Sequence, residues 1–168
     1  MQTQTYRVQR FFGVIEKIYF NILVFGICTH ASLSLGYILN AVVSVEYKGK
    51  SCYTFHTTGM SWTANRDACK KTGGDLISIE TQDEWSYISS ELRMSSVKSN
   101  AGWHVGLEQY NGQWVWINGK SFDVGHWGSQ EPSGDGPYTM MDSKGKLFDI
   151  AEKDNNGFIC EKPLGKMH

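Results

Sequence analysis

The stretch "SWTANRDACKKTGGDLISI" (residues 61–79) joins a complete helix signal to a short strand signal. Ser61 can cap the helix N-terminus with its hydroxyl, and the glycine pair at 73–74 can end the helix. The apolar residues Trp62, Ala68 and Cys69 fall loosely on one helical face. The following "DLISI" has the content of a strand. The stretch therefore predicts a helix that leads directly into a sheet.

The sequence on either side predicts a second helix and two hairpins. The run "VEYKGKSCYTFH" (residues 45–56) places aromatic and β-favouring residues around a glycine turn. Thr81 and Glu84 form a capping box, after which apolar residues recur at helical spacing until about Ser95. A further run, "WHVGLEQYNGQWVWINGKS" (residues 103–121), predicts two strands around an Asn-Gly turn.

The C-terminal third is less regular. Little periodicity is present between Trp127 and Leu147, whereas "KLFDI" (146–150) and "GFICEK" (157–162) read as two closing strands. A long irregular segment in a compact domain is usually functional or disordered, and its Trp and Pro residues favour order. Alternation along the preceding hairpin places two tryptophans on one strand face, which predicts that both belong to the core. These tryptophans are Trp114 and Trp116.

Composition and motifs exclude several function classes. The 16 basic and 17 acidic residues nearly cancel, so no basic field indicates nucleic acid. We find no nucleophile elbow, phosphate-binding loop or paired-histidine metal motif, so an enzyme is not predicted. Lys144 and Lys146 occupy positions where an EF-hand needs oxygen ligands. His56, His104 and His126 lack ligand-like spacing and are expected to be surface or half-buried imidazoles.

The N-terminal region resembles a secretory leader. Basic residues precede the apolar run "IYFNILVFGIC" (18–28), and the small-residue patch "THASLS" follows it. We expect cleavage near Ser32 or Leu35 and a secreted, extracellular protein. A second apolar stretch follows almost at once, so the alternative is an uncleaved anchor and a type II membrane protein. The predicted organisation is a signal peptide or signal anchor at 1–44, a globular domain at 45–163 and a short tail at 164–168.

The four cysteines lie at positions 28, 52, 69 and 160, and none forms a CxxC pair. This spacing excludes a zinc ribbon or a redox dithiol. It favours a long-range disulfide formed in an oxidising compartment, the alternative being a set of buried free thiols.

Six segments in order resemble the C-type lectin-like domain over about residues 45–163. They are "SCYTF", "WTANRDACKKTGGDLISI", "WHVGL", "WVWINGKSF", "HWGSQEPS" and "GFICEK". The resemblance implies an α+β fold in which two helices flank small antiparallel sheets beside a long irregular loop region. It also implies a disulfide between Cys69 and Cys160. The family's inner disulfide is absent, because its positions fall on Glu152 and near Tyr138-Thr139.

The resemblance leaves Cys52 without an assigned partner. Three states are open: a buried free thiol, a bond to another chain in a disulfide-linked dimer, or a bond to Cys28 if the leader is retained.

The resemblance also implies a sugar and calcium site on the loop, with a cis peptide bond before Pro132. Family members carry Glu-Pro-Asn for mannose-like sugars or Gln-Pro-Asp for galactose-like sugars, whereas this chain has Glu131-Pro132-Ser133. The next acidic position falls on Gly136-Pro137, and the Trp-Asn-Asp position keeps only Asp149. Glu131, Ser133 and Asp149 are thus the expected ligand-binding residues, and Glu131, Asp135 and Asp149 the expected metal ligands. Since calcium affinity falls with lost ligand charge, we expect calcium to bind weakly at best.

The sequence therefore predicts an extracellular C-type lectin-like recognition module that binds carbohydrate on a glycan or glycoprotein, with weak or absent calcium dependence. The alternative is a calcium-independent protein–protein interaction domain. Contact with a membrane is expected only if the N-terminal segment is an uncleaved anchor.

Overall fold

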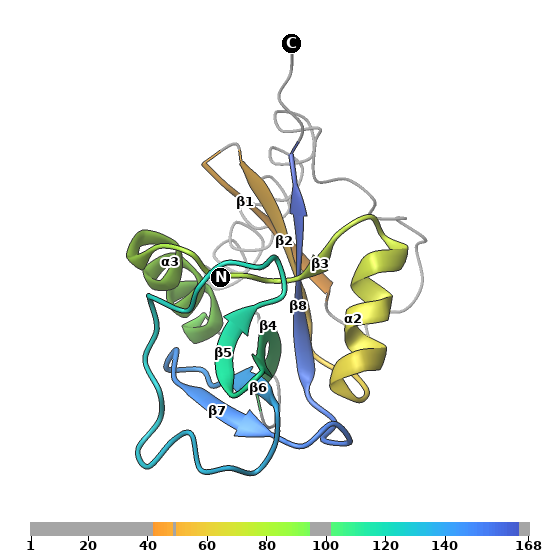
Figure 1. Ribbon diagram of the computed structural model, residues 1–168. Coiled ribbons are helices and arrows are strands. Elements are labelled where there is room, and N and C mark those ends of the chain that lie inside the picture. Colours follow the sequence, from red (N-terminus) through yellow and green to blue (C-terminus); the bar gives the residue numbers. More distant parts are fainter. Residues whose placement is uncertain (1–41, 49, 95–101, 165–168) are drawn as a thin grey trace, which may run out of the picture. The chain divides into compact units, whose positions relative to one another are not determined.

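The structure, a computed structural model, describes residues 42–48, 50–94 and 102–164 (Figure 1). The expectations for the leader and for residues 165–168 lie outside these ranges. Within them, no helix has the length and apolar character needed to cross a membrane.

The strands form one mixed sheet. Its order is β1-β2-β8-β4-β6-β7, with β3 paired to β8 and β5 paired to β4. The strands are β1 (Val42–Tyr47), β2 (Ser51–His56), β3 (Asp75–Leu76), β4 (Trp103–Tyr110), β5 (Gln113–Trp116), β6 (Tyr138–Met141), β7 (Leu147–Ile150) and β8 (Gly157–Pro163). The α+β prediction is confirmed. The strands are nevertheless joined rather than split into separate small sheets, because β8 pairs in parallel with β4 and so connects the two groups of antiparallel strands.

The first predicted helix is α2 (Trp62–Lys71), which begins after Ser61 as the sequence indicated. The Ser61 hydroxyl accepts a hydrogen bond from the Ala64 amide at 3.4 Å. The buried face of α2 carries Trp62 and Cys69, which pack with Leu76, Phe158 and Cys160. In Figure 1 the helix runs beside β8.

The predicted disulfide between Cys69 and Cys160 is present, with a Cα–Cα distance of 5.3 Å across a sequence separation of 91 residues. It joins α2 to the closing strand. Cys52 is buried and is disulfide-bonded, so it is not a free thiol. Cys28, one of the two bonding partners left open for Cys52 by the sequence, lies outside the described residues.

The second helix, α3 (Gln82–Arg93), lies on the other side of β2 and β8 from α2 (Figure 1). Its N-cap hydroxyl, Thr81 Oγ1, accepts from the Glu84 amide at 3.2 Å. The capping box is only half formed, because the Glu84 carboxylate accepts from the Glu80 amide and the Tyr53 hydroxyl instead. The core-facing residues of α3 are Trp85, Ile88 and Leu92.

The hairpin of β4 and β5 turns at Asn111 and Gly112, whose φ angles of 49° and 78° are those of a tight hairpin turn. Trp116 is buried in the core, as predicted. Trp114 is half-buried, because it lies nearer the exposed turn of the hairpin: it packs against the core and also lines a surface pocket.

The segment between Trp127 and Leu147, predicted to have little regular structure, contains strand β6. Thr139 and Met141 point inward and are buried, and the strand pairs with both β4 and β7. A four-residue strand that follows a Gly-Pro step carries too little periodicity to be recognised locally.

His104 corrects a sequence prediction, because it is fully buried rather than at or near the surface. Strand β4 is buried from Trp103 to Leu107, so its polar residue has no exposed face to occupy. The Asn65 amide nitrogen lies 2.9 Å from Nδ1, and the Asn156 amide lies 3.1 Å from Nε2. Burial lowers the pKa of His104 to about 4, against the opposing charges of Glu152 and Asp154.

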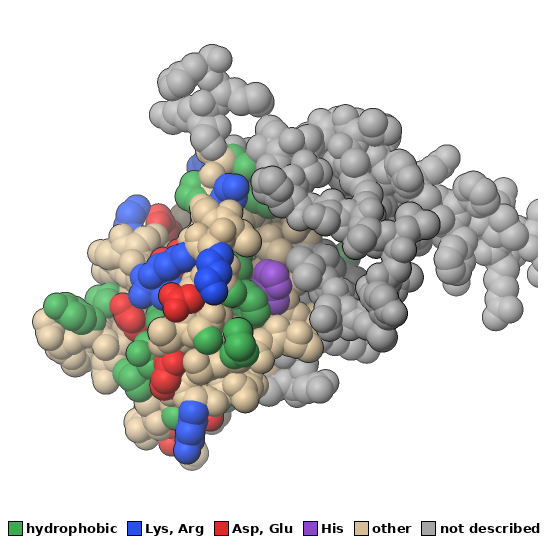
Figure 2. Space-filling model, turned by 90° about the vertical axis from the view of Figure 1, so that its right-hand side faces the viewer, with side chains coloured by type: hydrophobic (Ala, Val, Ile, Leu, Met, Phe, Trp, Pro, Cys, Tyr) green, Lys and Arg blue, Asp and Glu red, His purple; other side chains and the backbone are tan. Residues whose placement is uncertain are grey.

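Acidic and basic side chains are interspersed over the face shown in Figure 2, in keeping with a net charge of −1.

Candidate ligand-binding site

The loop before β6 is shaped by local backbone features. The Glu131–Pro132 peptide bond is cis, as predicted, and Gln130 and Gly134 have φ angles of 66° and 89°. Gly136 passes so close to β7 that a Cβ atom there would lie 2.1 Å from the carbonyl oxygen of Ile150. A glycine is therefore required for this approach.

Asp149, on β7, is the anchor of this loop. Its side chain is buried, with only 3% of the residue exposed. Oδ1 accepts from the Ser133 amide at 2.6 Å and from the Ser133 hydroxyl at 3.0 Å. Oδ2 accepts from the amides of Gly134 at 2.8 Å and Gly136 at 3.3 Å. Both carboxylate oxygens are thus occupied by donors of the loop itself.

Glu131 supports the same cluster. Its Oε2 atom accepts from the Asp149 amide at 3.2 Å and lies 3.4 Å from the Ser133 hydroxyl. That hydroxyl has one proton to donate, and the shorter distance to Asp149 favours Asp149 as its acceptor. The structure therefore brings together Glu131, Ser133 and Asp149. Asp135 is exposed, and within the described part of the chain no hydrogen bond joins its carboxylate to the cluster.

The hydrogen bonds determine the charge state of the site. Burial by itself would raise the pKa of Asp149, but its interactions with Glu131 and the hydrogen bonds from Ser133 and Gly136 outweigh burial and lower that pKa to about 2. Burial and the neighbouring Asp149 raise the pKa of Glu131. Asp149 is consequently ionised throughout the neutral range.

The calcium shell that the family resemblance implies does not fit this arrangement. Calcium takes about six to eight oxygen ligands with free lone pairs. Here the Asp149 oxygens already accept four hydrogen bonds, and the Ser133 hydroxyl donates toward the carboxylates. Among residues 42–48, 50–94 and 102–164, no group of three His, Cys, Asp or Glu side chains is placed to hold a metal ion.

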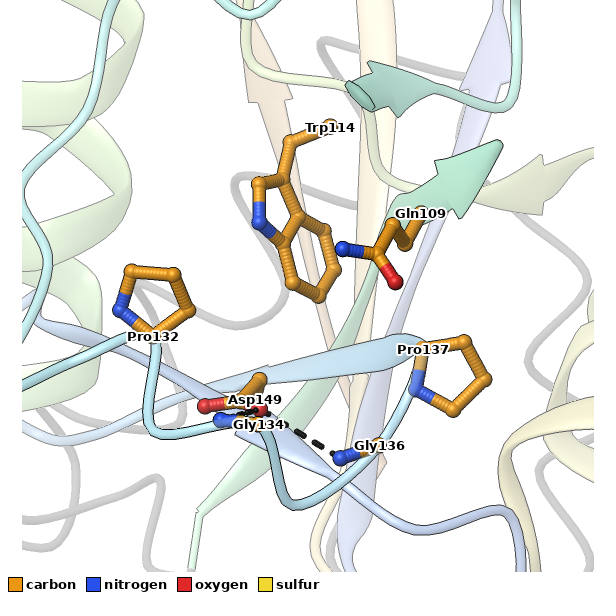
Figure 3. A pocket seen from close by; sticks show the side chains of 7 residues that line it. All are labelled: Gln109, Trp114, Pro132, Gly134, Gly136, Pro137 and Asp149. Atoms are coloured by element: carbon orange, nitrogen blue, oxygen red, sulfur yellow. Dashed lines mark hydrogen bonds between the residues drawn. The ribbon is translucent and has the colours of Figure 1, made fainter. Parts of the chain in front are cut away.

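A pocket of about 360 Å³ lies between the loop and the β4–β5 hairpin (Figure 3). It is lined by Gln109, Trp114, Pro132, Gly134, Gly136, Pro137 and Asp149. Trp114 and Gln109 face the two prolines across it, and Asp149 lies at its base beside the two glycines (Figure 3).

Sequence reasoning missed the hairpin wall of this pocket. Pairing of β4 with β6 and a 2.8 Å hydrogen bond from the Gln109 amide to the Pro137 carbonyl bring the hairpin and the loop together. These contacts join residues far apart in sequence. The local signal that could have indicated the site is a tryptophan close to an exposed hairpin turn.

The described residues thus form a looped α+β domain in which the Cys69–Cys160 disulfide joins α2 to β8 and a pocket lies beside the loop. The sequence model of the Lectin C-type domain family matches residues 58–162, and the chain belongs to this family.

Individual relatives are distant. The galactose-specific lectin nattectin of Thalassophryne nattereri is 28% identical over 123 residues, which cover 70% of this chain and 77% of that protein. C-type lectin domain family 4 member M of Nomascus concolor is 27% identical over 119 residues, which cover 67% of this chain and only 29% of that protein. The crystal structure of human lithostathine superimposes with a TM-score of 0.64 at 23% identity, covering 71% of this chain and 88% of lithostathine.

Proposed function

We propose that this protein is an extracellular, non-enzymatic recognition module that binds a glycan in the pocket between the loop and the β4–β5 hairpin, without requiring calcium. The observation that carries the proposal is the full occupation of the Asp149 carboxylate by four donors from Ser133, Gly134 and Gly136.

In the calcium-dependent arrangement that the family resemblance implies, a calcium ion held by side chains of the loop keeps the loop in the conformation that binds the sugar. In this chain a buried carboxylate holds the loop from inside. Successive backbone amides that converge on an anion form a stable concavity, and a loop fixed in advance loses less entropy when a ligand binds. The pocket can therefore exist ready for its ligand without an ion.

The lining of the pocket supports sugar recognition over catalysis. Trp114 is half-buried and offers an aromatic surface, the kind of group against which the apolar face of a sugar ring packs. The lining contains no pair of side chains that could act as nucleophile and base. The similarity to nattectin, a galactose-specific lectin, supports a carbohydrate as the ligand class.

The disulfide between Cys69 and Cys160 supports an oxidising compartment, and hence secretion or display on the outer cell surface. A calcium-independent protein-binding domain is the second candidate. The exposed Tyr110, at the tip of the hairpin beside the pocket, favours it, because exposed aromatics are enriched at protein interfaces.

A glycan array probed with the full-length protein tests the proposal. The expected result is binding to the same glycans, with equal signal, in millimolar calcium and in excess chelator. Glycan binding in calcium that disappears in chelator would show a calcium-dependent lectin. Binding to protein ligands, with no glycan bound under either condition, would favour the second candidate. We expect Asp149→Asn to weaken glycan binding under both conditions, whereas the exposed Asp135→Asn leaves it unchanged.

A further inference from the structure

We infer that the pocket prefers uncharged sugars that carry an N-acetyl group, with Trp114 packing against the ring and Gln109 pairing with the acetamido group. This inference rests on the proposed function, since it names the ligand class of the same pocket.

Polar partners in the pocket are few. Of the seven lining residues, only Gln109 and Asp149 have polar side chains, apart from the single indole N–H donor of Trp114. The Asp149 oxygens are already hydrogen-bonded to the loop. Among the lining side chains, the exposed Gln109 amide is therefore the one that can offer a ligand both a donor and an acceptor.

The chemistry of that amide selects a matching group. A glutamine side chain offers an acceptor oxygen and a donor NH₂ in one plane. An acetamido group offers the same pair, so the two can form two hydrogen bonds at once. Gln109 and Trp114 are direct cross-strand partners on one face of the hairpin, so the amide lies beside the aromatic surface (Figure 3).

The apolar part of the lining completes the match. Trp114, Pro132 and Pro137 form walls that can contact the acetamido methyl group and the C–H face of the ring. A plain hexose replaces the acetamido group with a hydroxyl, which can form only one of the two hydrogen bonds with the Gln109 amide and has no methyl group to contact the apolar walls. The volume of about 360 Å³ lies at the small end of ligand pockets, which suits one terminal sugar.

The negative charge at the base of the pocket favours uncharged sugars over anionic ones. Asp149 is ionised at neutral pH, Glu131 lies against it, and none of the lining residues is basic. A sugar that carries a carboxylate or sulfate would bring a like charge to this base. An anionic N-acetylated sugar should thus be rejected even though it carries the acetamido group.

The test is titration of single sugars into the full-length protein in chelator, followed by calorimetry and by saturation-transfer NMR. We expect N-acetylglucosamine or N-acetylgalactosamine to bind about ten-fold more tightly than glucose or galactose, the factor that one net hydrogen bond of ordinary strength supplies. N-acetylneuraminic acid should bind no better than the plain hexoses.

Two variants locate the effect. Gln109→Ala should lower the affinity for the N-acetyl sugars about ten-fold and abolish the preference over hexoses. The matched control is Gln113→Ala on the same hairpin, an exposed residue outside the pocket lining, which should leave the preference intact. Trp114→Phe should lower the affinity for every sugar that binds, and thermal unfolding checks that this variant is folded.

The outcomes separate the inference from the function on which it rests. Binding of hexoses and N-acetyl sugars with equal affinity, or a preference that survives Gln109→Ala, would overturn the inference and leave glycan binding standing. Absence of binding to every sugar, in calcium and in chelator, would overturn both.

Discussion

Two regions of this domain are held in place by different means. The clamped region, formed by α2, β3 and β8 around the Cys69–Cys160 bond, combines a covalent link with buried apolar side chains. The ligand loop, residues 127–137, has an exposed stretch from Pro132 to Asp135 and is fixed mainly by hydrogen bonds to Asp149. The clamped region is held by two kinds of interaction, whereas the exposed stretch of the loop depends mainly on one carboxylate.

This difference explains how the chain can depart from its family's loop sequence and keep the fold. The fold is determined by packing and by the long-range disulfide. Apart from Trp127, which packs against the core, the loop contributes little apolar burial, and segments of this kind open most easily in native proteins. Its order must come from polar contacts, which Asp149 supplies.

Removal of the clamp should have the largest effect. We expect the double variant Cys69→Ala and Cys160→Ala to lose about 4 kcal/mol of unfolding free energy, because the bond closes a loop of 91 residues. Denaturant unfolding measures the change. A loss below about 1 kcal/mol would show that packing alone holds α2 on β8.

Acid should weaken the packing of β4 against α2, where His104 is buried beside Asn65, before it weakens the loop. The pKa of His104 is about 4 in the folded state against 6.5 in an exposed reference, so its contribution is complete above pH 6.5 and is lost as the pH falls through 4. The loss amounts to about 3 kcal/mol by linkage. Unfolding free energies measured at pH 7 and pH 4 give the slope, which His104→Gln should flatten.

The exposed His126 supplies the control, since His126→Gln should leave the dependence of the unfolding free energy on pH unchanged.

Asp149 behaves differently, because its pKa is lowered from 3.8 to about 2. Its contribution is present above pH 3.8 and is lost as the pH falls toward 2. A slope between pH 6.5 and 4 that survives His104→Gln would assign acid sensitivity to other groups.

Asp149→Asn should destabilise the domain by about 2 kcal/mol, because the new NH₂ group faces backbone donors and leaves them unsatisfied. Hydrogen exchange should accelerate at the Ser133, Gly134 and Gly136 amides, while the amides of α2 keep their relative protection. Asp135→Asn is the matched control and should change stability by less than about 0.5 kcal/mol. Equal effects of the two variants would contradict the role assigned to Asp149.

The smallest expected effect is that of Ser133→Ala. The variant removes the 3.0 Å hydroxyl contact to Asp149 but keeps the 2.6 Å amide contact, so we expect a loss of about 0.5–1 kcal/mol. Ser129→Ala, also exposed and in the same loop, should leave stability unchanged in the same denaturant titration.

The sequence could predict features that local patterns encode. The Ser61 and Thr81 caps, the Asn111-Gly112 hairpin and the order of the elements follow from periodicity and turn chemistry. The disulfide and the cis peptide bond before Pro132 followed from the family resemblance.

Features that depend on long-range pairing were not predictable. Burial of His104 follows from the central place of β4 in the sheet. The pocket wall formed by Gln109 and Trp114 requires the pairing of β4 with β6. The family resemblance pointed to Glu131, Ser133 and Asp149, which the structure brings together, but gave no sign that Asp149 accepts hydrogen bonds from loop amides.

Hydrogen exchange at the Ser133, Gly134 and Gly136 amides, followed by NMR in excess chelator and in millimolar calcium, tests most directly whether Asp149 holds the loop without an ion. We expect the same protection in both conditions, and any calcium affinity to be no tighter than about 10⁻⁴–10⁻³ M, the range of weak extracellular modules. Loss of protection in chelator, with recovery at micromolar calcium, would contradict the account and show that the loop is organised by the ion.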